Sequence, residues 1–246
     1  MANFLPLKNY ILSVSDKMIK KHDLTGPFLD VGGGRGDVSL HYATAGFRGV
    51  LVDRSTEAIT AARKTLVNFA DQVQVQNCEV ADVAGTFNMA FLFDVLEHVE
   101  DDDKLLSEIW AKLNPGGTLL IVVPTNPSEW RWDDDYYGHL RRYDPEQLIK
   151  LLETKGFDVT ANLDITFPFF WALRRIYTRF LTPRISNEEH ALRRTEISSL
   201  NNSWHISPII NRLAQSMILW RPLLVIQPLF KNTTLGCERL FVARKS

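Results

Sequence analysis

The amino-acid sequence predicts an α/β fold built on a parallel β-sheet. From Phe28 onward, short apolar runs alternate with amphipathic stretches, which is typical of βαβ units. One apolar run ends in Asp30 and passes directly into the glycine-rich segment 32–36, as a strand does when it turns into a helix. The chain has 246 residues, enough for one large domain or for one domain with an insertion.

Residues 1–27 precede the first predicted strand, and we expect them to form a helical lead-in. Apolar residues recur there at helical spacing: Tyr10, Ile11, Val14, Met18 and Ile19. Further along, Ser55 is expected to cap a helix that runs to about Phe69. The acidic run 101–103 is expected to begin an amphipathic helix, and this role explains the run without a metal ion.

Residues 28–164 form the predicted core, and a further helix is signalled near its end. Asp144-Pro145-Glu146-Gln147 supplies an N-cap carboxylate, a proline at the first helical position and a glutamine at the third. Gly156 is expected to end this helix, and residues 157–159 open the next strand. Residues 238–243 read as the last strand, within a segment 237–246 that returns to the core.

The glycine-rich segment predicts a nucleoside-type ligand site. Glycines at 32, 34 and 36 permit positive φ and leave no Cβ wall, so a ligand can lie against the main chain at the start of the following helix. Asp37 stands where the dinucleotide pattern would have its third glycine. Carboxylates at 30 and 37 suit a positively charged ligand better than a pyrophosphate. S-adenosylmethionine, with its sulfonium and ammonium groups, is such a ligand.

Five ordered motifs together resemble the class I S-adenosylmethionine-dependent methyltransferases. They are Asp30 with the glycines that follow it, the apolar run 50–52 ending in Asp53, the run 73–78 followed by Glu79, the segment 91–98 and the Pro-Gly-Gly turn in 113–117. The resemblance covers about residues 28–160 and returns at the C-terminus. It implies a Rossmann-like, seven-stranded, mostly parallel sheet with helices on both faces. The seventh strand would lie antiparallel between the fifth and sixth, after a helical insertion.

The resemblance also implies which residues hold the cofactor, whose product form is S-adenosylhomocysteine. Asp53 lies 17 positions after Gly36 and could accept both ribose hydroxyls, while Glu79 and Val80 would hold the adenine edge. The full predicted set is Asp30, Gly32, Gly33, Gly34, Gly36, Asp53, Arg54, Glu79, Val80 and Asp94. In the resembling family the N-terminal segment often closes over the cofactor, with Tyr10 the aromatic candidate here.

The candidate catalytic residues are His98, Glu97 and His139. His98 follows the predicted fourth strand, at the sheet edge where open α/β folds bind ligands, and is the first candidate for a general base. The alternative is that the Leu-Glu-His turn only holds its loop. Asp94-x-x-Glu97-His98 also resembles the Glu-x-x-Glu-His motif of ubiquinone-biosynthesis O-methyltransferases, in which acids and His hold a divalent metal. Since Asp replaces the first Glu, the favoured assignment has no metal, and a divalent ion remains the alternative.

A second candidate patch combines aromatics, a histidine and two arginines. It runs from the Trp130-Arg131-Trp132 segment through Gly138-His139-Leu140-Arg141-Arg142-Tyr143 and could grip an anionic or ring-bearing acceptor. The alternative is that Arg141 and Arg142 only pair with the acids at 133–135.

Residues 165–236 differ from the rest of the chain. They hold nine Lys and Arg against three Glu, a net charge of +6, and many aromatics. Met217 to Phe230 is the most apolar run, but Arg221 and Pro222 interrupt it and it falls short of the ~20 residues of a membrane-spanning helix. We expect a helical lid that selects an amphipathic, anionic acceptor. A homodimer interface, a simple covering layer and peripheral contact with an anionic membrane are the alternatives.

The whole composition narrows the function classes. A net charge of −1 argues against a dedicated nucleic-acid binder. Two cysteines without a C-x-x-C pair suit a reducing compartment, and no signal peptide is recognised, so the protein is expected to be cytoplasmic. We expect O-methylation of a quinone, lipid or natural-product intermediate. The alternatives are methylation of a peptide or protein end and a non-catalytic regulatory or scaffold subunit.

Overall fold

The computed structural model describes residues 6–180 and 217–246. Seven strands form one sheet in the order β3-β2-β1-β4-β5-β7-β6. Their bounds are β1 Phe28–Val31, β2 Gly49–Val52, β3 Val73–Gln76, β4 Phe87–Phe93, β5 Leu113–Pro124, β6 Phe157–Asp164 and β7 Glu238–Lys245. Strands β1 to β5 pair in parallel, and β7 runs antiparallel between β5 and β6. The expected strand order is therefore confirmed.

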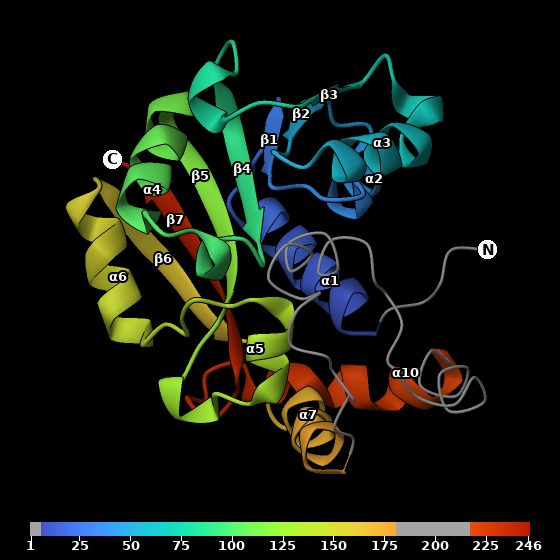
Figure 1. Ribbon diagram of the computed structural model, residues 1–246, viewed down its shortest axis with the longest axis vertical. Coiled ribbons are helices and arrows are strands. Elements are labelled where there is room, and N and C mark those ends of the chain that lie inside the picture. Colours follow the sequence, from blue (N-terminus) through green and yellow to red (C-terminus); the bar gives the residue numbers. More distant parts are fainter. Residues whose placement is uncertain (1–5, 181–216) are drawn as a thin grey trace.

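Helices cover both faces of the sheet (Figure 1). On one face, α1 (Pro6–Lys21), α2 (Asp37–Thr44) and α3 (Thr56–Thr65) share a hydrophobic core with β1, β2 and β4. On the other, α4 (Asp102–Lys112) and α6 (Pro145–Thr154) pack against strand residues of opposite pleat. Because successive strand side chains alternate in direction, strands buried on both faces need the near-continuous apolar runs seen in the sequence.

The predicted helix starts are confirmed by their caps. The Ser55 hydroxyl accepts the Ala58 N–H, the Asp101 carboxylate accepts the Lys104 N–H, and Asp144 accepts two backbone N–H groups of α6. The helix after Ser55 is shorter than predicted, since α3 ends at Thr65 and a separate 3₁₀ turn, η1 (Val67–Phe69), follows it. Ordinary caps thus account for the acidic residues that begin α4 and α6.

The Pro-Gly-Gly turn differs from the expectation of a turn that precedes strand five. β5 begins at Leu113, directly after α4, and the four residues 114–117 are looped out between two paired positions. Leu113 pairs with Phe87, and the register resumes with Thr118 opposite Met89. Gly116 has a φ of 75°, which favours glycine, so the turn is an irregularity within the strand.

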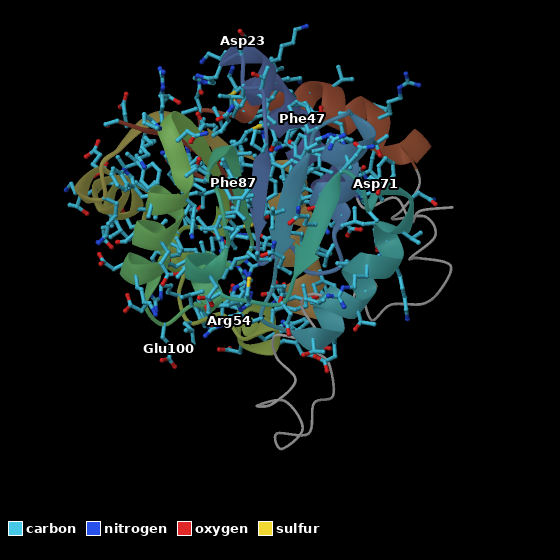
Figure 2. All side chains as sticks on the ribbon, turned by 90° about the horizontal axis from the view of Figure 1, so that it is seen from above. Asp23, Phe47, Arg54, Asp71, Phe87 and Glu100 are labelled. Atoms are coloured by element: carbon cyan, nitrogen blue, oxygen red, sulfur yellow. The ribbon has the colours of Figure 1, made fainter. Side chains whose placement is uncertain are left out.

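The carboxyl ends of the parallel strands lie at one edge of the sheet. Arg54 and Glu100, which follow β2 and β4, lie at this edge, whereas Asp23 and Phe47, which precede β1 and β2, lie at the opposite edge (Figure 2). Helices α5 (Trp132–Tyr137), α7 (Phe169–Phe180) and α10 (Met217–Ile226) gather below the tip of the β4 arrow (Figure 1). The short 3₁₀ turns η2 (Val80–Asp82), η3 (Leu96–His98), η4 (Pro127–Glu129) and η5 (Gln227–Phe230) complete the described elements.

The described parts of the predicted insertion are helical and pack against the lead-in helix α1. Trp220 of α10 stacks on Phe170 of α7 at 4.7 Å, and Phe170 contacts Tyr10 of α1 at 6.1 Å. Tyr10 therefore belongs to a third hydrophobic cluster. The remainder of the predicted insertion, residues 181–216, lies outside the described residues. None of the helices in the described ranges is long and apolar enough to cross a membrane.

Candidate functional site

A cavity of about 1220 Å³ opens at the carboxyl edge of the sheet. It is lined from α1 and the ends of β1, β2 and β4 on one side, and from α5, α7, α10 and the start of β7 on the other. All predicted site residues except Gly36 line it: Asp30, Gly32, Gly33, Gly34, Asp53, Arg54, Glu79, Val80, Asp94, Glu97, His98 and His139. The topology thus brings the two predicted groups of residues into one space.

The glycine turn has the backbone that the sequence predicted. Gly32 and Gly34 have φ values of 64° and 54°, and a Cβ on Gly32 would lie 2.6 Å from a methyl group of Val95. Gly36 has another role, because it begins α2 with a φ of 85° and packs against Leu66 of the segment after α3. The first two glycines therefore shape the cavity wall, and Gly36 allows the helix to start and to pack.

Two buried or half-buried carboxyls flank this turn. Asp53 is held from both sides, since Oδ2 accepts the Gly34 N–H at 3.0 Å and Oδ1 accepts the Ser55 N–H at 2.8 Å. Asp30 accepts the backbone N–H and the hydroxyl of Ser39 at 3.1 and 2.6 Å. Burial raises the pKa of Asp30 to about 6, against the opposing effect of the Ser39 hydrogen bonds. Both carboxyls are fixed in place, and Asp53 can accept hydrogen bonds from ligand hydroxyls.

The outer rim of this half carries the predicted adenine contacts. Arg54 and Glu79 form an exposed ion pair with 2.7 Å between Nε and Oε1. Val80 is buried beside them and lines the cavity. The adenine role of Glu79 and Val80 stays a prediction.

Two histidines face each other across the other half of the cavity. His98 Nδ1 lies 3.2 Å from the Gly138 carbonyl oxygen, and His139 Nδ1 lies 2.8 Å from Asp134 Oδ1. Each acceptor requires an N–H on Nδ1, so each neutral ring has an unprotonated Nε2. Both Nε2 atoms lie 3.9 Å from Glu97 Oε1, and the ring centroids are 5.0 Å apart. Burial and the neighbouring His139 ring lower the pKa of His98, which favours the neutral form that can accept a proton.

Asp134 is the hub that fixes the second histidine. Its carboxylate is fully buried and also accepts hydrogen bonds from Arg142 Nε at 2.9 Å and from an Arg174 nitrogen at 2.8 Å. Burial alone would raise the pKa of Asp134, but the hydrogen bonds from His139 and Arg142 and the two guanidinium charges hold it well below its usual range. His139 is therefore positioned by an ionised carboxylate.

The arginines of the second candidate patch do not face the cavity as free cations. Arg142 pairs with Asp134, as the alternative interpretation held, whereas Arg141 pairs with Asp102 of α4 at 2.8 Å. Trp130 and Trp132 do not line the cavity, and Trp132 packs against Tyr177 at 5.3 Å. From this patch the cavity receives His139, Tyr137 and the already paired Arg142.

Glu238 is a cavity residue that the sequence reasoning missed. It is the first residue of β7, opposite Pro124 at the end of β5, and it hydrogen-bonds Asp94. Burial and the Asp94 carboxylate raise the pKa of Glu238 well above its ordinary value, and the same two causes raise that of Glu97. The available signal was topological: an antiparallel strand brings its first residue to the edge where parallel strands end.

The donor set also fits a divalent metal. Glu97, His98 and His139 each offer one ligand atom, and these atoms all lie within 4.8 Å of one another. Glu97 Oε2 has no hydrogen-bond partner among the described residues, and both imidazoles are oriented through Nδ1 as metal-bound histidines commonly are. The set differs from the sequence motif, because His139 takes the place that the motif gave to Asp94. Imidazole and carboxylate donors suit zinc, iron or manganese.

Comparisons with known proteins agree with the fold and the glycine turn. The family described as methyltransferase domain matches residues 7–162. The tRNA 5-carboxymethoxyuridine methyltransferase of Escherichia coli (strain K12) is 31% identical over 100 residues, covering 38% of this chain and 38% of the relative. The ubiquinone biosynthesis O-methyltransferase of Xanthomonas axonopodis pv. citri (strain 306) is 33% identical over 97 residues, covering 38% and 41%. The matches thus span about two fifths of these relatives.

Solved structures resemble the whole described fold at low identity. The magnesium protoporphyrin IX methyltransferase from Synechocystis PCC 6803 with bound S-adenosylhomocysteine has a TM-score of 0.57 at 14% identity, covering 98% of this chain and 84% of that one. The [4+2]-cyclase SpnF has a TM-score of 0.58 at 20% identity, covering 95% and 80%. A cyclase and a methyltransferase thus share this fold, so function has to be argued from the site. With the family match spanning more than half of its length, the chain belongs to the methyltransferase domain family, in the class I S-adenosylmethionine-dependent group.

Proposed function

We propose that the protein transfers a methyl group from S-adenosylmethionine to a hydroxyl oxygen of an amphipathic small molecule. The observation that carries the proposal is the joining, in one cavity, of the Asp53–Gly34 cradle and the paired unprotonated Nε2 atoms of His98 and His139. The cradle suits the hydroxyls and cations of the cofactor, and a neutral imidazole suits deprotonation of an alcohol or phenol. A relative named as an O-methyltransferase supports oxygen as the accepting atom.

The proposed chemistry asks little covalent participation of the protein. The cofactor would supply an electrophilic methyl group on its sulfonium. Asp53 and the Gly34 backbone would hold the nucleoside, and His98 Nε2 would take the hydroxyl proton as the oxygen–methyl bond forms and the sulfur–methyl bond breaks. Asp134 would keep His139 in the tautomer whose Nε2 faces the same point. Alignment of the two reactants would provide most of the rate enhancement.

The apolar walls support an acceptor with a sizeable hydrophobic body. Phe170, Leu173 and Trp220 line the cavity from α7 and α10, and Tyr137 and Tyr177 line it from α5 and α7. Aromatic and aliphatic walls around a few convergent polar groups are the usual form of a small-molecule site. A peptide end remains the alternative acceptor, and a non-catalytic regulatory subunit remains the non-enzyme alternative.

The test combines cofactor binding with methyl incorporation. Calorimetry should detect S-adenosylhomocysteine binding and no NAD binding. Radiolabelled methyl groups from S-adenosylmethionine should enter the lipid and quinone fraction of a cell extract and not the RNA or protein fractions. His98→Ala should lower this incorporation by about 10²–10⁴-fold with cofactor affinity retained. Loss of cofactor binding in that variant would assign His98 to loop support, and labelling of RNA would disprove the acceptor class.

A metal-assisted variant of the same reaction is the second candidate, favoured by the close approach of Glu97, His98 and His139 donors. A bound divalent ion would act as a Lewis acid on the acceptor oxygen. Prolonged chelation should then remove a stoichiometric metal, measurable by elemental analysis, and lower methyl incorporation. Full incorporation after chelation would reject the metal variant and leave the general-base form.

A further inference from the structure

The cavity is markedly acidic, whereas the chain as a whole is nearly neutral. Among the described residues, twelve Asp and Glu line it against six Lys and Arg, a formal excess of six negative charges. S-adenosylmethionine has two positive groups and one carboxylate, so it offsets only part of this excess. The remaining negative charge has to be matched by protons or by the second ligand.

The cationic side chains of the acceptor half are already committed to protein partners. Arg174 donates to the carboxylates of Asp133 and Asp134, and Arg142 donates to Asp134 and to two backbone carbonyls. Arg175 of α7, although basic, pairs with Glu129 and lies over the Trp171 ring. Two arginines and two aspartates therefore cancel, and these guanidinium groups have few donors left for an anionic acceptor.

Three carboxyls of the acceptor half have no Lys or Arg ion-pair partner in the part of the chain that the structure describes. Asp94 leaves β4 with a left-handed φ of 55°, and Glu238 of β7 hydrogen-bonds it across the edge of the sheet. Glu97 follows in η3 with a side chain that is 1% exposed, and its Oε2 accepts no hydrogen bond from a described residue. All three line the same cavity. A buried carboxyl oxygen without a partner is costly, which indicates that a bound group completes this site.

We propose that the acceptor carries a protonated amine, and that the carboxyl groups of Asp94, Glu97 and Glu238 bind it while the acceptor hydroxyl faces His98. This inference rests on the proposed function and names its substrate class as an amphipathic amino alcohol or aminophenol. Three carboxyls held close together repel one another when ionised, and a bound ammonium group relieves that repulsion while donating several charge-assisted hydrogen bonds. The aromatic rings of Tyr137 and Tyr177, which line the cavity, can support the same cation through their π faces.

The experiment uses three probes that share a phenyl ring and differ in the polar head: 2-phenylethylamine, 2-phenylethanol and 3-phenylpropionate. Their dissociation constants are measured by calorimetry on the full chain saturated with S-adenosylhomocysteine, in EDTA so that no metal occupies Glu97. The wild-type protein should bind the amine at least about tenfold more tightly than the carboxylate, the scale of one charge-assisted hydrogen bond. Tighter binding of the carboxylate would overturn the proposal without any variant.

The variant Glu238→Gln keeps the side-chain shape and removes one of the three carboxyls. It should weaken binding of the amine about tenfold and leave the neutral alcohol and S-adenosylhomocysteine within about twofold. Glu153→Gln, the same change on the exposed surface of α6, should alter none of the three constants. An unchanged amine constant in Glu238→Gln would overturn the proposal, and so would equal weakening of S-adenosylhomocysteine, which would assign the carboxyls to the cofactor. If the wild-type protein bound no S-adenosylhomocysteine at all, the proposed function itself would fail.

Discussion

At the residue scale, the site depends on carboxyls whose partners decide their charge. Asp53 is held by two backbone N–H groups, Asp134 by two arginines and a histidine, and Glu238 by another carboxyl. The same side-chain chemistry thus gives a hydroxyl acceptor, a fixed anion and a cation site. Each of these roles has its own measurable consequence.

Asp53→Ala should weaken cofactor binding. The substitution removes the acceptor of the Gly34 N–H and the proposed acceptor of the ribose hydroxyls, so a loss of about 1.5–3 kcal/mol in the binding free energy of S-adenosylhomocysteine is expected. Calorimetry measures it, with Asp71→Ala on the exposed surface as the matched control. Unchanged binding in Asp53→Ala would remove this residue from the ribose role.

Asp134→Asn should lower the stability of the fold. The change leaves Arg142 and Arg174 buried with less negative charge, which costs about 3–5 kcal/mol in the free energy of unfolding. Since the pKa of Asp134 is lower in the folded than in the unfolded chain, its contribution is complete above the unfolded value of about 4 and is lost as pH falls below it. Urea unfolding at pH 7 and pH 3 should therefore separate wild type from variant at pH 7 and bring them closer at pH 3. Asp158→Asn, exposed on β6, is the control, and an equal gap at both pH values would contradict the linkage.

The pH dependence of turnover tests whether His98 is the base. Burial and His139 lower its pKa, so the imidazole stays neutral, and competent, down to pH values below the ordinary 6.5. The acid limb of kcat should consequently fall below pH 6.5, with a plateau at neutral pH. A limb above pH 7 would indicate a different titrating group.

At the element scale, the strand-to-helix turn after β1 is what gives a ligand access to the backbone. Gly32 combines a positive φ with a position where a Cβ would lie 2.6 Å from Val95, so two separate effects oppose any side chain there. Gly85 has a comparable φ of 86°, and a Cβ at that position would have no atom of the described residues within 4 Å. Gly85 is therefore a control for backbone strain alone.

Gly32→Ala should abolish detectable cofactor binding or weaken it at least about tenfold, because the turn has to shift to accept the methyl group and Val95 lines the same cavity. Gly85→Ala should lose stability only, by about 1 kcal/mol or more, with the binding constant unchanged. Titration with S-adenosylhomocysteine and thermal unfolding of both variants provide the comparison. Normal cofactor affinity in Gly32→Ala would show that the turn tolerates displacement.

At the scale of the whole molecule, the described parts of the insertion join the lead-in helix in closing the cavity. Phe170 and Trp220 line it and pack on α1, so the elements predicted to select the acceptor also contribute to a hydrophobic cluster. Replacing residues 165–236 with a linker would expose that cluster, which makes a point substitution the sharper test. The membrane and homodimer contacts predicted for this region remain predictions; loss of vesicle binding at raised ionic strength would identify an electrostatic membrane contact.

Trp220→Ala should lower methyl incorporation into the acceptor fraction about tenfold or more while the affinity for S-adenosylhomocysteine stays within about twofold. The indole supplies apolar area to the acceptor half, and its removal costs about 3–5 kcal/mol of stability as well. Incorporation is therefore measured below the melting temperature of the variant. Trp110→Ala, on α4 at the opposite face of the sheet, is the control for loss of a packed tryptophan.

The sequence by itself determined the strands, the caps of α3, α4 and α6, and the glycine turn, because apolar periodicity, side-chain caps and positive φ are local properties. The resemblance added the order of the strands. Only the tertiary structure decided which acids meet which cations. Arg174 pairs with Asp133 across 41 positions of sequence, and the antiparallel direction of β7 brings Glu238 beside Asp94. Net charge counted along a segment cannot reveal such pairing, since Coulomb interactions depend on distance in space. For that reason the basic segment 165–236 suggested an anionic acceptor, whereas the cavity that it helps to close is acidic.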